Sequence, residues 1–201
     1  MKKIIFSLFT LFSISYASGG CVLVQSEDMN VTWKAYKTLD NVEVKGTFTS
    51  VDYLPIAKEG KNFKELLVGS SVQIDTTKTD TGDLQMDDTP VSTCFKQLKA
   101  TSIKAEVTGI KADKHVKGKP YQGVLDVRIT INGKSLVKPM HYLYENERFV
   151  AKASIDLFDF SGKEALASVN KDCYDVNKGK TWNDLDLEFA ILIKATLCNV
   201  K

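Results

Sequence analysis

Hydrophobic and polar residues alternate with a period of two along most of the chain after residue 21. This period is typical of β-strands that bury one face. It predicts eight strands, whose inward residues are, in chain order, Val31, Trp33 and Ala35; Val42, Val44, Gly46 and Phe48; Val72, Ile74 and Thr76; Ile103, Ala105 and Val107; Leu125, Val127, Ile129 and Ile131; Met140, Tyr142 and Tyr144; Phe149, Ala151, Ala153, Ile155 and Leu157; and Leu185, Leu187, Phe189, Ile191 and Ile193. No repeat or linker interrupts the series, which indicates one domain.

Two of the connections between these strands have helical periodicity instead. In the first, residues 89–98, Pro90 occupies the first helical position and an apolar stripe follows, formed by Val91, Cys94, Phe95 and Leu98. In the second, residues 161–173, Ser161 and Glu164 have capping-box spacing and the stripe consists of Leu166, Val169 and Cys173. A shorter helical piece is predicted near residues 62–67.

An eight-stranded antiparallel sheet with one apolar face closes most simply into a barrel, because closure removes the exposed edges. The sequence therefore predicts an all-β fold, an eight-stranded antiparallel barrel with two short capping helices. Strands that run alternately up and down would place both helical connections at the same end. A barrel of this size can be filled by its own side chains or can enclose one small ligand.

The first seventeen residues have the pattern of a secretory signal peptide. Lys2 and Lys3 precede an apolar stretch that extends to Ile14, and residues 15–17 form a small-x-small cleavage site. The apolar stretch has about 12 residues, fewer than the roughly 20 that a membrane-spanning helix needs. We therefore expect a mature barrel domain of residues 18–201 in the periplasm. A retained anchor, or lipidation at Cys21, remains an alternative.

Charge and residue types argue against several classes of function. Without Lys2 and Lys3 the chain has 25 basic and 25 acidic residues, a balance that does not favour binding to nucleic acid. His115 and His141 have no metal-ligand spacing, and no phosphate-binding loop or nucleophile elbow is present. Asp184, Asp186 and Glu188 alternate along one strand and are expected on its outer face. We therefore expect no catalysis, cofactor or metal.

Several short motifs resemble the YceI-like family of polyisoprenoid-binding, lipocalin-like periplasmic proteins. Residues 31–48, which end in Gly46-x-Phe48, are similar to the family's first strand pair, and residues 70–88 to the strand that leads into its Thr-Gly segment. The turn at residues 131–139 and the closing strand at residues 183–191 also resemble it. Two features depart from the family: Lys37 occupies a position that is often His, and "DLQMDD" replaces its usual basic and His residues.

The resemblance implies a lipocalin-like barrel around an apolar tunnel that holds an isoprenoid, a quinone or a fatty-acid-derived lipid. Burial of about 20 carbons at roughly 0.8 kcal/mol each exceeds an association cost of about 4–15 kcal/mol, so hydrophobic contact can hold such a ligand. The residues expected to line the tunnel are Val31, Trp33, Val44, Phe48, Ile74, Phe95, Leu125, Val127, Met140, Tyr142, Phe149, Phe158, Phe189 and Ile191. Two alternatives remain, a filled barrel that binds another envelope protein and an enzyme acting on a lipid headgroup. The oligomeric state is open, with a homodimer as one option.

The four cysteines of an exported chain are expected to form disulfides. Cys21 precedes the first strand and Cys198 ends the last, whereas Cys94 and Cys173 belong to the helical connections. Strands of about eight residues separate the two barrel ends by roughly 26 Å, and bonded cysteines need Cα atoms within about 7 Å. The sequence therefore predicts Cys21–Cys198 and Cys94–Cys173, with a reduced, buried Cys94 as the alternative.

Overall fold

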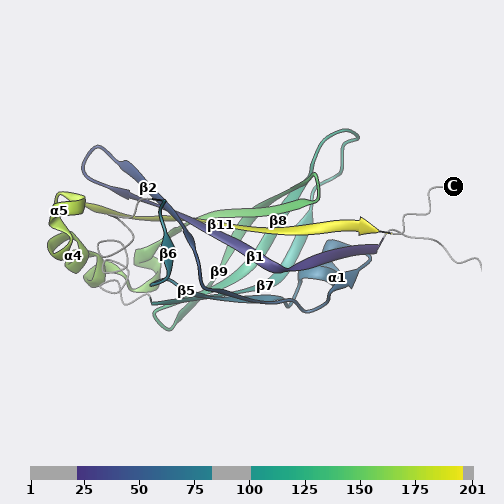
Figure 1. The fold of residues 1–201 in the computed structure, drawn as a ribbon, viewed down its shortest axis with the longest axis horizontal. Helices are drawn as coiled ribbons and strands as arrows, with labels where there is room; N and C mark the ends of the chain where they lie inside the picture. The colour runs from purple at the N-terminus through teal and green to yellow at the C-terminus, as the bar shows by residue number, and fades with distance from the viewer. Residues whose placement is uncertain (1–21, 83–100, 197–201) are drawn as a thin grey trace, which may run out of the picture.

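A computed structural model describes residues 22–82 and 101–196, which form one curled, antiparallel sheet with small helices at its ends (Figure 1). The strands are β1 (Val22–Lys37), β2 (Val42–Phe48), β3 (Val51–Leu54), β4 (Glu59–Gly60), β5 (Ser71–Asp75), β6 (Thr79–Asp80), β7 (Ser102–Ala112), β8 (Tyr121–Ile131), β9 (Lys134–Glu145), β10 (Arg148–Asp156) and β11 (Thr181–Thr196). The helices are α1 (Phe63–Leu67), the 3₁₀ helix η1 (Leu157–Phe160), α4 (Lys163–Asp172) and α5 (Tyr174–Asn177). None of these helices is long and apolar enough to cross a membrane.

All eight predicted strands are present, as β1, β2, β5 and β7 to β11. On β8, β9 and β11 the inward residues alternate with more exposed ones, so the all-β, lipocalin-like prediction is confirmed. The inward position predicted for Val42 on β2 is wrong, because its side chain is 46 % exposed near the start of that strand. Three further strands, β3, β4 and β6, were not predicted because segments of two to four residues are too short to show a reliable period. The helix predicted at residues 89–98 lies outside the described residues.

The sheet order is β3-β5-β7-β8-β9-β10-β11-β1-β2-β6, with β4 paired to the start of β1. The order places β1 and β11 side by side, as a closed barrel requires of its first and last long strands. Gln25 of β1 joins the two sides of the curl, because its amide nitrogen donates to the carbonyl oxygens of Ala57 and Leu66 and its amide oxygen accepts from the Tyr53 hydroxyl. The side chain of Gln25 is buried.

The helices lie at opposite ends of the sheet (Figure 1). Helices α4 and α5 stand at one end, and α1 stands near the other, where β11 ends. The predicted stripe on α4 is confirmed, since Leu166, Val169 and Cys173 are all buried. The predicted capping box is wrong: Ser161 ends η1 in a left-handed conformation, and Gly162 is the residue that precedes α4. The chain reversal after η1 occupies Ser161, so its hydroxyl does not cap α4.

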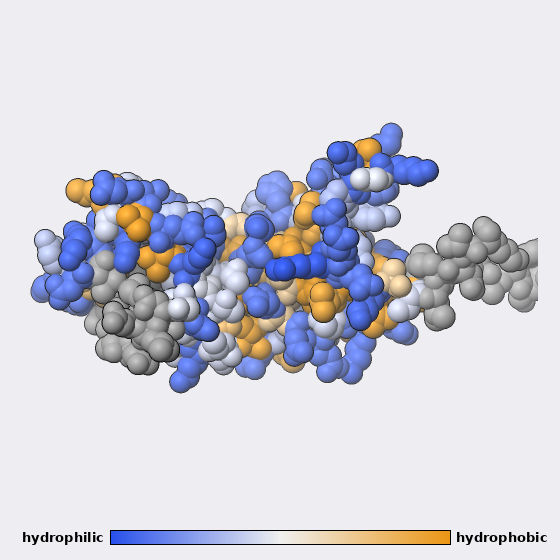
Figure 2. Space-filling view, turned by 45° about the horizontal axis from the view of Figure 1, so that its top comes forward, coloured by the Kyte–Doolittle hydropathy of each residue, from blue (hydrophilic) through white to orange (hydrophobic). Residues whose placement is uncertain are grey.

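Buried side chains from the inner face of the sheet form a continuous core. Towards the end that carries α4, this core is filled by large aliphatic and aromatic residues with almost no exposed surface, among them Ile74, Ile103, Ile131, Ile155, Phe160 and Leu187. The outer face is polar and charged in alternation with scattered apolar residues. Figure 2 shows this mixed surface, in which apolar areas lie among hydrophilic ones. The alternation predicted from sequence therefore corresponds to a real inside and outside.

Candidate functional site

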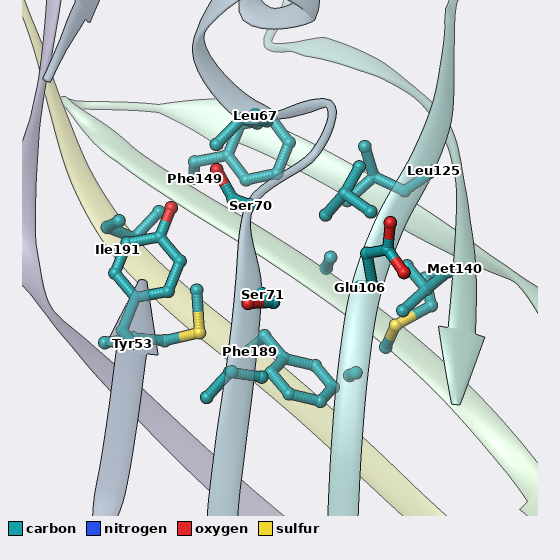
Figure 3. Close-up of a pocket in the computed structure, with 16 residues that line it drawn as sticks. Tyr53, Leu67, Ser70, Ser71, Glu106, Leu125, Met140, Phe149, Phe189 and Ile191 are labelled. Carbon is teal, nitrogen blue, oxygen red and sulfur yellow. The ribbon is translucent and has the colours of Figure 1, made fainter. Parts of the chain in front are cut away.

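A cavity of about 50 Å³ lies in the middle of the curled sheet. Figure 3 shows side chains from opposite walls pointing towards it, including Tyr53, Leu125, Phe149 and Phe189. The lining is mostly apolar and consists of Met29, Tyr53, Leu67, Ser70, Ser71, Val72, Ala105, Glu106, Val107, Leu125, Val127, Met140, Phe149, Ala151, Phe189 and Ile191. A cavity of this volume has room for only a few water molecules.

The predicted tunnel residues differ in their positions in the structure. Six of them line the cavity, namely Leu125, Val127, Met140, Phe149, Phe189 and Ile191. Five are buried in the core without lining it, namely Val31, Trp33, Phe48, Ile74 and Tyr142. Val44 is only partly buried, and Phe95 lies outside the described residues.

Phe158 requires a correction. Its side chain is 45 % exposed, so it does not lie in the barrel interior. The buried aromatic residue of this segment is Phe160, because the 3₁₀ turn of η1 directs the two rings to different sides. On α4, Leu166 and Val169 pack into the core but do not line the cavity.

Several lining residues were absent from the predicted tunnel set. Val72, Ala105, Val107 and Ala151 had been predicted to face inward but not to line the tunnel, whereas those of β3 and of the turn after α1 were not predicted at all. Tyr53 lies on β3, and Leu67 and Ser70 lie at and after the end of α1. The alternation of Val51 and Tyr53 was the available signal, but the strand is only four residues long. The positions of Leu67 and Ser70 depend on contacts with distant segments, such as the hydrogen bond from Gln25 to the carbonyl oxygen of Leu66.

Polar groups at the cavity are satisfied by hydrogen bonds within the protein. The Tyr53 hydroxyl donates to Gln25, 2.6 Å away, and burial is the main cause that raises the pKa of Tyr53. The Ser70 hydroxyl accepts from the backbone N–H of Ile56 at 3.0 Å. Glu106 directs its carboxylate to Arg128 on the outer face, at 2.6 Å. The cavity therefore offers a lipid hydrocarbon surface and few polar groups that lack a partner.

A cluster of aromatic rings packs between the cavity and α1. Phe63 of α1 makes edge-to-face contacts with Tyr142, Tyr144 and Phe149, at centroid distances of 6.1, 5.0 and 5.2 Å. Tyr142 also stacks on Phe149, which lines the cavity, at 4.8 Å. This geometry closes the end of the barrel near α1 with aromatic rings, each of which buries a large area.

Two of the predicted tunnel residues, Trp33 and Tyr142, each carry one polar group that can bind a ligand headgroup or a strand neighbour. The Trp33 indole N–H donates to the Thr79 hydroxyl at 2.8 Å, so it is satisfied by a strand neighbour. The Tyr142 hydroxyl is buried and has no hydrogen-bond partner among residues 22–82 and 101–196. Burial, and then the charge of Asp113, raise the pKa of Tyr142. The Trp33 indole is therefore paired, whereas Tyr142 stacks on Phe149, which lines the cavity, but does not line the cavity itself.

We expect Tyr142→Phe to raise the free energy of unfolding by about 1 kcal/mol, because burying an unpaired hydroxyl costs about 1–3 kcal/mol. The matched control is Tyr144→Phe, which loses the hydrogen bond from the Tyr144 hydroxyl to the carbonyl oxygen of Ile193 and should lower this free energy by a similar amount. Urea unfolding of both variants measures the difference. Equal destabilisation by the two substitutions would show that the Tyr142 hydroxyl has a partner in solution.

The raised pKa of Tyr142 also predicts a dependence on pH. The folded state favours the neutral hydroxyl, so this contribution to stability is complete below the ordinary tyrosine pKa near 10 and is lost as the pH rises through the higher folded value. Urea unfolding at a series of alkaline pH values should therefore show a smaller loss of stability in Tyr142→Phe than in the unmodified protein. An identical loss in both would contradict the assignment to Tyr142.

Comparison with known proteins relates this architecture to solved structures. No protein-family model matches the chain, and no curated protein matches it. A polyisoprenoid-binding domain from Saccharophagus degradans superposes with a TM-score of 0.53 at 11 % identity, over 87 % of this chain and 98 % of that one. The Campylobacter jejuni YceI protein superposes with a TM-score of 0.50 at 14 % identity, over 79 % of this chain and 88 % of that one. The chain has the YceI-like fold.

A third structure, BcnA from Burkholderia cenocepacia, superposes with a TM-score of 0.50 at 14 % identity, over 83 % of this chain and 96 % of that one. The three solved proteins are covered almost completely, so the YceI-like fold accounts for nearly their whole length. At these identities the similarity is one of fold. The apolar cavity described above lies inside the curled sheet that defines this fold.

Proposed function

We propose that the protein is a non-catalytic carrier that encloses an isoprenoid or fatty-acyl lipid inside its barrel. The observation that carries the proposal is the apolar cavity at the centre of a YceI-like fold, bordered by six of the residues expected there from sequence. One protein of the same fold is a polyisoprenoid-binding domain, which supports the same class of ligand for this chain. Hydrophobic burial supplies the binding energy, at about 25 cal/mol per Å² of apolar surface.

The cavity must widen before it accepts a long hydrocarbon chain, because about 50 Å³ holds only a few waters. Its lining contains two methionines, Met29 on β1 and Met140 on β9. Methionine is unbranched and adapts to irregular spaces at low cost. We therefore expect a lipid to displace these two side chains first, while the aliphatic core near α4 stays packed.

The decisive experiment is native mass spectrometry of the purified protein, followed by organic extraction and incubation with geranylgeraniol as a probe. The carrier function predicts one bound lipid per chain, either retained on purification or taken up from the probe. Heat-denatured protein under the same conditions serves as the control and should bind none specifically. A protein that has its bare sequence mass and takes up no lipid would refute the carrier function.

We also propose that the chain acts in the periplasm after removal of residues 1–17 and carries the disulfides Cys21–Cys198 and Cys94–Cys173. The register of β1 and β11 supports the bond Cys21–Cys198. Val22, next to Cys21, is the register partner of Thr196, which is two residues before Cys198. Helix α4, which ends next to Cys173, stands at the other end of the sheet from the end of β11 (Figure 1). Peptide mapping without reduction tests both bonds, and a peptide joining Cys21 to Cys173 would overturn them.

A further inference from the structure

The wall of the barrel is interrupted along β1. Opposite β11, the register jumps from Gln25–Ile193 to Met29–Ile191, so residues 26–28 bulge out opposite Leu192. On its other side, within the described residues, β1 pairs with β4 at Leu23 and Val24 and with β2 from Thr32 to Lys37. The stretch of β1 between these two pairings therefore borders β3 without a ladder of backbone hydrogen bonds.

A surface groove of about 520 Å³ lies at this interruption. It is lined by Ser26, Asp28, Met29, Asn30, Phe48, Thr49, Val51, Arg148, Ala190, Ile191 and Leu192. Met29 and Ile191 line both this groove and the interior cavity. These two side chains, which are register partners on β1 and β11, therefore mark the place where the outside groove and the apolar interior are in contact.

The cavity and the groove differ in the chemistry of their lining residues. The cavity is lined mostly by hydrocarbon, whereas the groove adds hydroxyl, amide and charged groups. Its charges include Asp28 and Arg148, and the Arg148 guanidinium lies 3.5 Å from the carboxylate of Glu188. Glu27, next to the groove in sequence, pairs with Lys58. The groove therefore presents neutral hydrogen-bonding groups and nearly balanced charge, which suits a polar but uncharged group.

We infer that this groove is the outer half of the lipid site. The hydrocarbon chain of the lipid lies in the widened cavity and passes between β1 and β3 beside Met29. A neutral headgroup, a hydroxyl or a carbonyl, lies in the groove among Ser26, Asn30 and Thr49. This inference rests on the proposed carrier function and specifies the side of the barrel through which the ligand reaches solvent. It also specifies the headgroup class.

The test is to block the groove with Thr49→Trp, since Thr49 is exposed and lines the groove but not the cavity. The matched control is Lys104→Trp, an equally exposed strand position on β7 that lines neither. Equilibrium dialysis with geranylgeraniol should show at least a tenfold loss of affinity for Thr49→Trp and less than a twofold change for Lys104→Trp. Asn30 lines the groove from β1, so Asn30→Trp should cause the same loss of affinity. This second variant keeps the test decisive if Thr49→Trp does not fold.

The headgroup class is tested with geranylgeranyl diphosphate, which has the same chain and a strongly anionic end. The unmodified protein should bind it at least tenfold more weakly than geranylgeraniol. Stronger binding of the diphosphate would overturn the neutral headgroup, and unchanged affinity for geranylgeraniol in both folded Trp variants would place the opening at an end of the barrel. Binding of neither probe by the unmodified protein would refute the carrier function itself, an outcome distinct from both.

Discussion

Ala151→Leu should reduce the affinity for a long-chain lipid about 100-fold and leave the fold intact. Ala151 is 3 % exposed on β10 and lines the central cavity, so a larger side chain would occupy the space that a lipid chain needs. Forcing extra carbons into a packed interior costs typically about 1–3 kcal/mol, and a 100-fold loss corresponds to about 2.7 kcal/mol. In the absence of lipid, the cavity of about 50 Å³ accommodates much of the added side chain.

Equilibrium dialysis with geranylgeraniol measures the loss, and thermal unfolding verifies the fold. Ala195→Leu provides the matched control, because Ala195 is exposed near the end of β11 and does not line the cavity. Ala105→Leu, at another buried position of the cavity lining, on β7, should act like Ala151→Leu. If both cavity variants bind lipid as well as the control does, the ligand does not occupy the barrel interior.

Gly123→Ala is expected to lower the free energy of unfolding by about 3 kcal/mol, the upper end of the usual cost of overpacking. A β-carbon at this position of β8 would lie 2.2 Å from the carbonyl oxygen of Lys111 and 2.8 Å from the ring of Tyr142. The first neighbour is backbone of the paired strand β7, so it cannot move without distorting the ladder. The second is a buried ring that stacks on Phe149.

Urea unfolding of Gly123→Ala should be compared with that of Gly109→Ala on β7. There the added β-carbon would lie 3.1 Å from a carboxylate oxygen of Asp126, the mobile end of an exposed side chain, and we expect a cost below about 1 kcal/mol. Equal costs for the two variants would show that the close approach around Tyr142 relaxes in solution. Displacement of the Tyr142 ring should also perturb the cavity, because Phe149 lines it.

Individual motifs show how far the local sequence could predict the structure. The hairpin at Asn132-Gly133 was predicted from a Gly turn, and both residues have positive φ, as a tight two-residue hairpin turn requires. Gly46 was identified only as an inward strand position and as part of a motif. Its reason is tertiary: a β-carbon there would lie 2.9 Å from the Trp33 ring and 2.8 Å from the carbonyl oxygen of Asp80. Nothing in the alternating pattern identifies the residue that needs this space.

The sequence by itself determined the eight main strands and most of the residues that face inward, because a strand's side chains alternate with a period of two whatever its neighbours are. Val42 on β2, predicted inward, is an exception at 46 % exposed. The sequence could not locate the cavity within that interior. The hydrogen bond of the Trp33 indole depends on Thr79, which is 46 residues away along the chain. The break in β1 depends on the register against β11, more than 160 residues away. Such pairings are set by packing across the whole barrel, so only the tertiary structure decided where the interior is filled, where it is hollow and where its wall is interrupted.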